Sequence, residues 1–75
     1  MIKTYLIDGL PVMVTGRPRH HPTSYTLHVA GRPIAGSVEK TVLGSFLARD
    51  GSRRSLGTFS GLPRAVEQVV REERR

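Results

Sequence analysis

The pattern of apolar and polar positions along the chain predicts mostly short strands. Apolar residues alternate with polar ones from Tyr25 to Ala30, the spacing of a strand with one buried face. The stretches Ile2 to Ile7 and Pro11 to Thr15 are rich in β-branched and aromatic residues. Asp8-Gly9 between them favours a hairpin turn, and the following Leu10 and Pro11 suggest a loop slightly longer than two residues.

The middle of the chain predicts further strands. Residues 34–39 fit either a weak strand or an irregular connection. Residues 40–48 fit a strand with a bulge or bend at Gly44. Asp50-Gly51 then favours a second hairpin turn, and residues 54–59 fit the returning strand.

The last segment predicts an amphipathic helix. Ser60 is expected to cap it, and Pro63 is tolerated in the first turn because its missing amide would have no partner there. Glu67 precedes Arg71 by four residues, the favourable order for an ion pair along a helix. The apolar stripe of this helix consists of Leu62, Ala65, Val66, Val69 and Val70. The strand residues expected to pack against it are Tyr25, Leu27, Val29, Phe46, Leu56 and Phe59.

These elements together predict a small α+β fold. We expect an antiparallel β-sheet of about four to six strands with one C-terminal amphipathic helix packed on a face. The 75 residues fit a single domain. Its expected segments are an N-terminal hairpin at 1–16, a flexible basic loop at 16–23, strands at 24–59 and a helix at 60–74. Whether the first hairpin joins the main sheet is left open by the sequence.

Composition narrows the expected partners. Twelve Lys and Arg against six acidic residues give a formal net charge of +6, which favours a polyanionic partner. Codon bias in a high-GC genome would produce the same arginines without such a function. The chain has no cysteine and no apolar run near the roughly 20 residues of a membrane span, so we expect a cytoplasmic protein that does not bind membranes.

No combination of residues in the sequence matches an enzyme or a metal site. His20 and His21 lie in a proline-rich loop, and His28 falls on the polar side of a strand. Asp8 and Asp50 are explained by turn formation. The histidines lack the spacing of a structural zinc site, so we expect no catalytic activity, no metal and no cofactor.

A first group of candidate DNA contacts flanks the second hairpin turn. Arg49, Arg53 and Arg54 surround Asp50-Gly51, where a hairpin tip can approach phosphates or enter the major groove. The planar guanidinium of arginine can contact a phosphate or a guanine with two hydrogen bonds. The alternative is a charged tip that serves only solubility.

A second group lies near the proline-rich loop. Gly16-Arg17-Pro18-Arg19 resembles the core of an AT-hook, which lies in the minor groove, although Thr15 stands where the hook has arginine. Even without that motif, a basic arm of this kind can contact the minor groove or the backbone. Lys40 completes the candidate set. Aromatic residues for stacking on single strands are scarce, which favours duplex DNA.

Residues 42–70 resemble the AP2-like, or arm-type, DNA-binding module at the N-terminus of many phage integrases. The shared pattern is a strand, a basic turn with glycine, a strand carrying Leu56-Gly57-Thr58-Phe59, and a capped helix with the early alanine Ala65. The resemblance implies a three-stranded antiparallel sheet that lies in the major groove, with residues 25–30 as its first strand. It further implies that Arg49, Arg53 and Arg54 face DNA and that Leu56, Phe59, Ala65 and Val69 lie in the core.

The sequence therefore predicts a non-catalytic protein that binds duplex DNA, as an accessory or regulatory factor of phage or bacterial origin. The alternative is a small protein-binding module without a nucleic-acid function. Such a module would be a phage factor that docks on a host protein, or an oligomer that self-associates through a sheet edge. A structural RNA-binding protein is a third reading.

Overall fold

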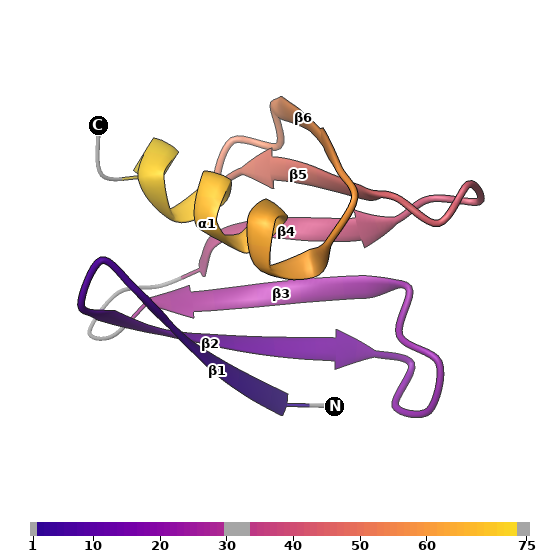
Figure 1. Ribbon diagram of the computed structural model, residues 1–75, viewed down its shortest axis with the longest axis horizontal. Helices are drawn as coiled ribbons and strands as arrows, with labels where there is room; N and C mark the ends of the chain where they lie inside the picture. Colours follow the sequence, from indigo (N-terminus) through magenta and orange to yellow (C-terminus); the bar gives the residue numbers. More distant parts are fainter. Residues whose placement is uncertain (1, 30–33, 74–75) are drawn as a thin grey trace.

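The computed structural model describes residues 2–29 and 34–73, apart from the side chains of residues 34 and 35. It contains one antiparallel sheet in which the strands follow one another in chain order, and a single C-terminal helix packs on it (Figure 1). This is the expected α+β fold, and the first hairpin belongs to the same sheet. Residues 1, 30–33 and 74, which the expected segments include, lie outside the described residues. The elements are β1 (Ile2–Ile7), β2 (Leu10–Arg17), β3 (Ser24–Val29), β4 (Ile34–Lys40), β5 (Phe46–Asp50), β6 (Ser55–Phe59) and α1 (Leu62–Glu73).

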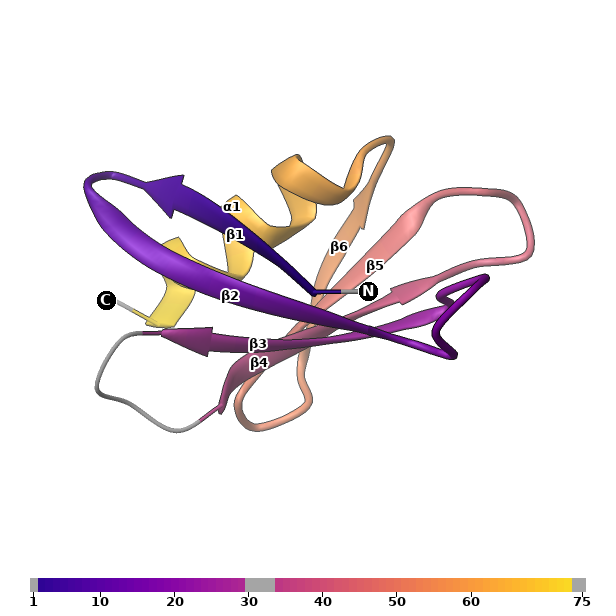
Figure 2. The same ribbon diagram turned by 90° about the horizontal axis from the view of Figure 1, so that it is seen from below.

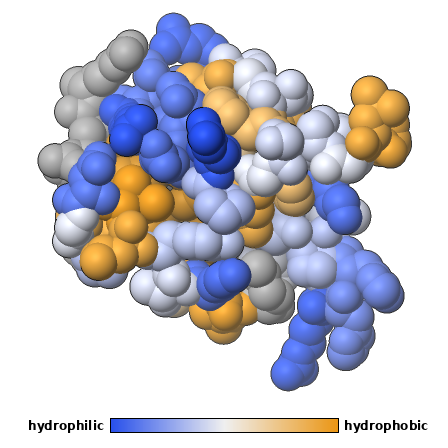
Figure 3. Space-filling view, in the orientation of Figure 1, coloured by the Kyte–Doolittle hydropathy of each residue, from blue (hydrophilic) through white to orange (hydrophobic). Residues whose placement is uncertain are grey.

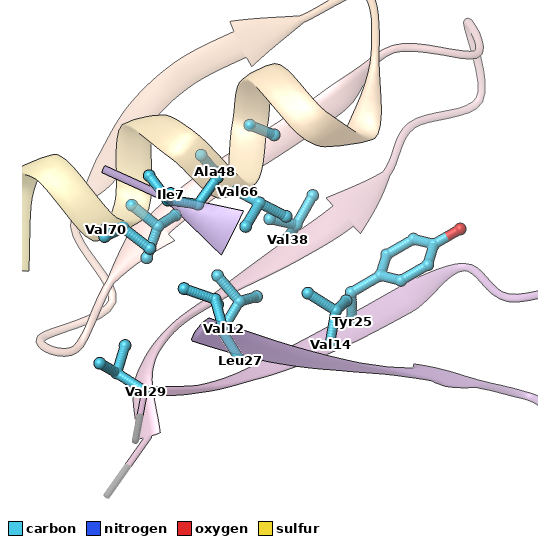
Figure 4. Close-up of a cluster of buried hydrophobic side chains, with 12 residues drawn as sticks. Ile7, Val12, Val14, Tyr25, Leu27, Val29, Val38, Ala48, Val66 and Val70 are labelled. Carbon is cyan, nitrogen blue, oxygen red and sulfur yellow. The ribbon is translucent and has the colours of Figure 1, made fainter. Parts of the chain in front are cut away.

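The core lies between α1 and one face of the sheet. The sheet curves so that β4, β5 and β6, and also the edge strand β1, contact the helix (Figure 2). Figure 4 shows side chains from the strands and the helix meeting in this layer. All but the first member of the expected helical stripe are buried, and Leu62 is partly buried. The buried apolar residues are Ile7, Val12, Val14, Tyr25, Leu27, Val29, Val38, Ala48, Ala65, Val66, Val69 and Val70.

The helix approaches the sheet most closely at Gly36 in β4. A Cβ atom placed there would lie 2.6 Å from Cγ1 of Val69 and would also overlap the backbone oxygen of Arg49. Real Cβ atoms do not approach other atoms this closely, so the position requires a residue without a side chain. Gly36 therefore allows β4 to be a central strand directly beneath α1, which resolves the open alternative for residues 34–39 in favour of a strand.

The first hairpin turn is shorter than expected. Ile7 pairs with Leu10, so the loop contains only two residues, Asp8 and Gly9. Both have positive φ angles, 51° and 79°, as in the type I′ turn that fits the natural twist of two antiparallel strands. The sequence suggested a longer loop because of Pro11, but Pro11 is accommodated as the second residue of β2.

The prediction of one strand over residues 40–48 is wrong. The chain instead turns between Lys40 and Phe46, and these two residues pair with each other. Gly44 has a φ angle of +83° and belongs to the turn, so it is not a bend within a strand. Residues 41–45 therefore form the β4–β5 turn, and Val42 and Leu43 lie in solvent at its tip.

Two further boundaries differ from expectation. β2 continues through Gly16 to Arg17, so the loop that follows covers only residues 18–23. The Thr23 amide donates to the Arg17 carbonyl at 3.0 Å, and the Lys40 amide donates to the Thr23 carbonyl at 2.8 Å, which fixes the end of this loop to β2 and β4. The helix begins at Leu62, and the first helical bond, from the Ala65 amide, goes to the Gly61 carbonyl at 3.3 Å. Gly61, and not Ser60, therefore occupies the cap position.

Candidate nucleic-acid interface

The structure divides the six candidate residues between two ends of the sheet. One group surrounds the β2–β3 loop and the end of β4, and the other surrounds the β5–β6 turn; Figures 1 and 2 both show these loops at opposite ends. We call the first group the basic end and the second the arginine hairpin. The basic end comprises Arg17, Arg19 and Lys40, and the arginine hairpin comprises Arg49, Arg53 and Arg54.

In the arginine hairpin, two of the three guanidinium groups are already occupied. Nε of Arg49 lies 3.9 Å from Oε1 of Glu39, and its Nη1 donates to the Arg53 carbonyl at 3.4 Å. Nε of Arg54 lies 3.6 Å from Oδ2 of Asp50, and its Nη2 lies 3.5 Å from Oε1 of Glu72. A phosphate that approached Arg49 or Arg54 would have to compete with these carboxylates, which weakens both as anion contacts.

Arg53 differs from its two neighbours. Its side chain is exposed and pairs with no carboxylate in the part of the chain that the structure describes. Its φ angle is 66°, the left-handed conformation that favours glycine. The turn is held by Asp50, whose Oδ1 accepts hydrogen bonds of 2.9 Å from the amides of Ser52 and Arg54. Asp50 thus keeps Arg53 in an unfavourable backbone conformation at the tip.

The cations of the basic end have no such partners. Arg17, Arg19 and Lys40 are all exposed, and none forms an ion pair with any carboxylate in residues 2–29 and 34–73. Glu39 is in the same cross-strand row as Arg17, with Ser24 between them, but its carboxylate lies beside Arg49. The positive charge of this end is therefore not neutralised by neighbouring side chains.

A groove lies between the basic loop and the β4–β5 turn. It has a volume of about 440 Å³, and its lining includes His20, His21, Tyr25, Lys40 and Val42. The Tyr25 hydroxyl donates to the Pro22 carbonyl at 3.4 Å, which holds the loop at one side of the groove. Figure 3 shows this end of the molecule as a hydrophilic projection and, above it, a hydrophobic one.

Most acidic residues are remote from the basic end. Asp8 lies in the β1–β2 turn at the opposite end, and its Oδ2 is 3.9 Å from Nε of Arg71. Oε1 of Glu67 lies 2.9 Å from Nη1 of Arg71, the expected pair along the helix. Glu72 and Glu73 belong to the last turn of α1. The molecule is therefore electrically asymmetric. Within the described part of the chain, the cations of the basic end are unpaired, whereas at the opposite end Arg49, Arg54 and Arg71 are paired and Arg53 is not, which favours orientation of a polyanion toward the basic end.

The strand order bears on the mapping implied by the resemblance. The strand that precedes β5 in the sheet is β4, so β3 is one strand further away than the mapping requires. The consecutive segment β4–β5–β6–α1 is the part of the chain with three strands followed by a helix. Of the core residues that the resemblance implies, Ala65 and Val69 are buried, whereas Leu56 and Phe59 are partly buried against the core.

The sequence interpretation did not identify the exposed apolar residues. Val42 and Leu43 were expected within a strand, but they are 104% and 91% exposed at the tip of the β4–β5 turn. Ile2, Leu6 and Met13 are exposed on the face of the sheet that the helix does not cover. The available signal was Gly44 directly after Val42-Leu43, since a glycine there can also complete a tight hairpin loop.

Within the described ranges, no group of three or more His, Cys, Asp or Glu side chains could hold a metal ion. The one described helix, α1, is too short and too polar to cross a membrane. No protein-family model, curated protein or solved structure matches the chain, so its function is inferred from the residues described above.

Proposed function

We propose that this protein binds duplex DNA without catalysing a reaction on it, as an accessory or regulatory factor. The observation that carries the proposal is the basic end, where Arg17, Arg19 and Lys40 are exposed and lack carboxylate partners among the described residues. Cations that are free in the unbound protein can replace the counterions of a phosphate backbone without first breaking an ion pair. The arginine hairpin then contributes chiefly through Arg53.

A duplex suits this surface better than a single strand. Single-strand binding relies on exposed aromatic rings that stack on bases. Here Tyr25 is buried, and Phe46 and Phe59 are partly buried against the core. Tyr5 is also partly buried, with Nζ of Lys3 5.3 Å from the centre of its ring. Phosphate contacts without stacking are the pattern expected for a protein that grips the backbone of a double helix.

Two triple variants of equal charge test this assignment. The first combines Arg17→Ala, Arg19→Ala and Lys40→Ala, and removes the basic end. The matched control removes three exposed arginines from the other end of the molecule, as Arg53→Ala, Arg54→Ala and Arg71→Ala. Fluorescence anisotropy with a labelled duplex at several salt concentrations measures affinity and its salt dependence, and circular dichroism checks that both variants remain folded.

Each phosphate contact contributes about 0.9 to the slope of log affinity against log salt concentration. Loss of three contacts should lower the magnitude of the slope by about 2.7. Between about 50 and about 200 mM salt, the affinity of the variant should therefore fall by a factor roughly 40 times smaller than that of the wild-type protein. The control should lower the slope by about 0.9 or less, because only Arg53 is unpaired. Equal effects of the two variants would contradict the basic end as the main contact, and wild-type protein without duplex affinity at low salt would exclude the function.

Self-association is the second candidate function, supported by a different surface. β1 is an edge strand, and Ile2 and Leu6 on its outer face are 72% and 74% exposed. Met13 of β2 lies beside them on the same face and is 43% exposed. An edge strand with exposed apolar side chains can pair with another chain. Light scattering should then detect a dimer that Leu6→Lys dissociates, whereas a wild-type monomer at high concentration would exclude this candidate.

A further inference from the structure

Two adjacent aliphatic residues form the most exposed apolar feature of the described chain. Val42 and Leu43 are 104% and 91% exposed, more than any other large hydrophobic residue there. They project from the tip of the β4–β5 turn, where Figure 3 shows a separate hydrophobic knob at the right of the molecule. We refer to these two residues as the apolar knob. Such side chains gain free energy when a partner removes them from water.

The knob is held on a rigid frame. The Gly44 amide donates to the Thr41 carbonyl at 3.0 Å, and the Thr41 amide donates to the Ser45 carbonyl at 2.8 Å. The Thr41 and Ser45 hydroxyls are also hydrogen-bonded at 2.8 Å, and the Ser45 amide donates to Oγ1 of Thr41 at 3.2 Å. The loop is therefore closed twice at its base. A preorganised knob loses little conformational entropy when it enters a binding partner.

The turn itself does not require apolar residues at its tip. Its geometry depends on Thr41 and Ser45 at the base and on Gly44 with its positive φ angle. The two positions between them are exposed, and polar residues are common at such positions of a turn. The fold therefore does not explain the choice of valine and leucine at these two positions.

The knob lies beside the basic end. Lys40 precedes the turn directly, and its side chain and Val42 line the same groove. A partner that is anionic at its surface and apolar within would match both Lys40 and the knob. Stacked bases behind a phosphate backbone have both properties, and so does an anionic lipid surface.

The size of the knob favours the duplex over the lipid. Wedges of one or two aliphatic side chains are sufficient to enter between base pairs from the minor groove. Stable anchoring to a membrane needs more apolar area, since even one myristoyl chain gives only marginal binding. Tryptophan, which is typical of membrane interfaces, does not occur in this chain.

We propose that Val42 and Leu43 act as a wedge that inserts between base pairs of the bound duplex and bends it, while the basic end contacts the flanking phosphates. This inference rests on the proposed function. Insertion unstacks one base step, and pyrimidine–purine steps such as TA unstack most easily. The wedge therefore introduces a preference for flexible steps without any hydrogen bond to a base.

The test separates bending from phosphate binding. Duplexes carrying a fluorophore at each end report bending by energy transfer, and 2-aminopurine beside a central TA step reports unstacking. The wedge variant is Val42→Ser with Leu43→Ser, and the matched control, Val42→Ile with Leu43→Met, keeps two exposed apolar side chains at the same positions. Wild-type protein and the control should bend the TA duplex and prefer it over an A-tract by on the order of tenfold. The wedge variant should lose both effects and keep the salt slope.

Other outcomes overturn the inference in distinguishable ways. If wild-type protein binds with the expected salt slope but neither bends nor unstacks the duplex, the wedge is excluded while phosphate binding stands. Unchanged bending by the wedge variant excludes it equally. No duplex binding at all removes both proposals. If wild-type protein and the control sediment with phosphatidylglycerol vesicles, the wedge variant does not, and no protein bends the duplex, the knob is assigned to an anionic lipid surface instead.

Discussion

Replacement of Arg53 by glycine should stabilise the protein. The β5–β6 turn has the same hydrogen-bond frame as the β4–β5 turn. The two turns comprise residues 41–45 and 50–54. In each, the amide of the fourth residue donates to the carbonyl of the first, and the amide of the first donates to the carbonyl of the fifth. The fourth residue has a positive φ angle in both turns, 83° at Gly44 and 66° at Arg53. The β4–β5 turn thus shows the residue that the frame prefers.

The magnitude follows from two opposing terms. The left-handed conformation costs a residue with a side chain about 1 to 2 kcal/mol. Glycine also makes the unfolded chain more flexible, which lowers the free energy of unfolding by about 0.4 to 1 kcal/mol. Arg53→Gly should therefore raise the free energy of unfolding by about 0.5 to 1 kcal/mol, or the melting temperature by about 2 to 8 °C for a domain of this size. The ion pairs of Arg54 in the same turn are unaffected by this change.

The reciprocal variant provides the control. A Cβ atom at Gly44 would have no atom within 4 Å, so Gly44→Ala introduces no clash and its cost is conformational alone. It should lower the free energy of unfolding by about 1 kcal/mol. Thermal and urea unfolding followed by circular dichroism measure both variants. A lower melting temperature for Arg53→Gly, together with no change for Gly44→Ala, would refute the comparison of the two turns.

Two further predictions concern the same framework and use urea unfolding. Asp50→Ala should lower the free energy of unfolding by about 1 to 2 kcal/mol, because two amides lose their acceptor at 2.9 Å, and Asp50→Asn should recover part of it since the amide oxygen can still accept. Gly36→Ala should cost about 1 to 3 kcal/mol by overpacking against Val69 and the backbone of Arg49, and a cost below about 0.5 kcal/mol would contradict the close approach.

The elements with strong local signals were predicted well from sequence. The stripe of α1 has helical spacing, and its members from Ala65 onward are buried as expected. The β5–β6 hairpin follows from Asp50-Gly51, because the aspartate side chain closes the turn through nearby amides. In both cases the determining contacts lie within a few residues of one another, so the sequence contains them directly.

The features that were missed depend on distant contacts or on exposure. Residues 40–48 fit a strand because Val42 and Leu43 are apolar, and apolar residues are usually buried. The pairing of Lys40 with Phe46 shows instead that the chain reverses between them. The sequence also did not show that Arg54 pairs with Glu72, because Glu72 lies 18 positions further along the chain. Ion pairs of that separation exist only once the helix has docked on the sheet.

The two similar turns also indicate which residues to attribute to function. The hydrogen bonds at the base of each turn and the residue with a positive φ angle determine its backbone conformation. A residue type that this conformation does not require must be explained by something other than the fold. Gly51 and Ser52 are residue types that are common at the exposed tip of a turn, whereas Val42 and Leu43 at the corresponding positions are not. Arg53 is the third exception, since glycine would suit its φ angle of 66° better. If Arg53→Gly stabilises the fold and weakens duplex binding, the arginine is retained for its charge. If it stabilises the fold and leaves binding unchanged, the arginine hairpin has no part in the interface, and the basic end must account for the affinity alone.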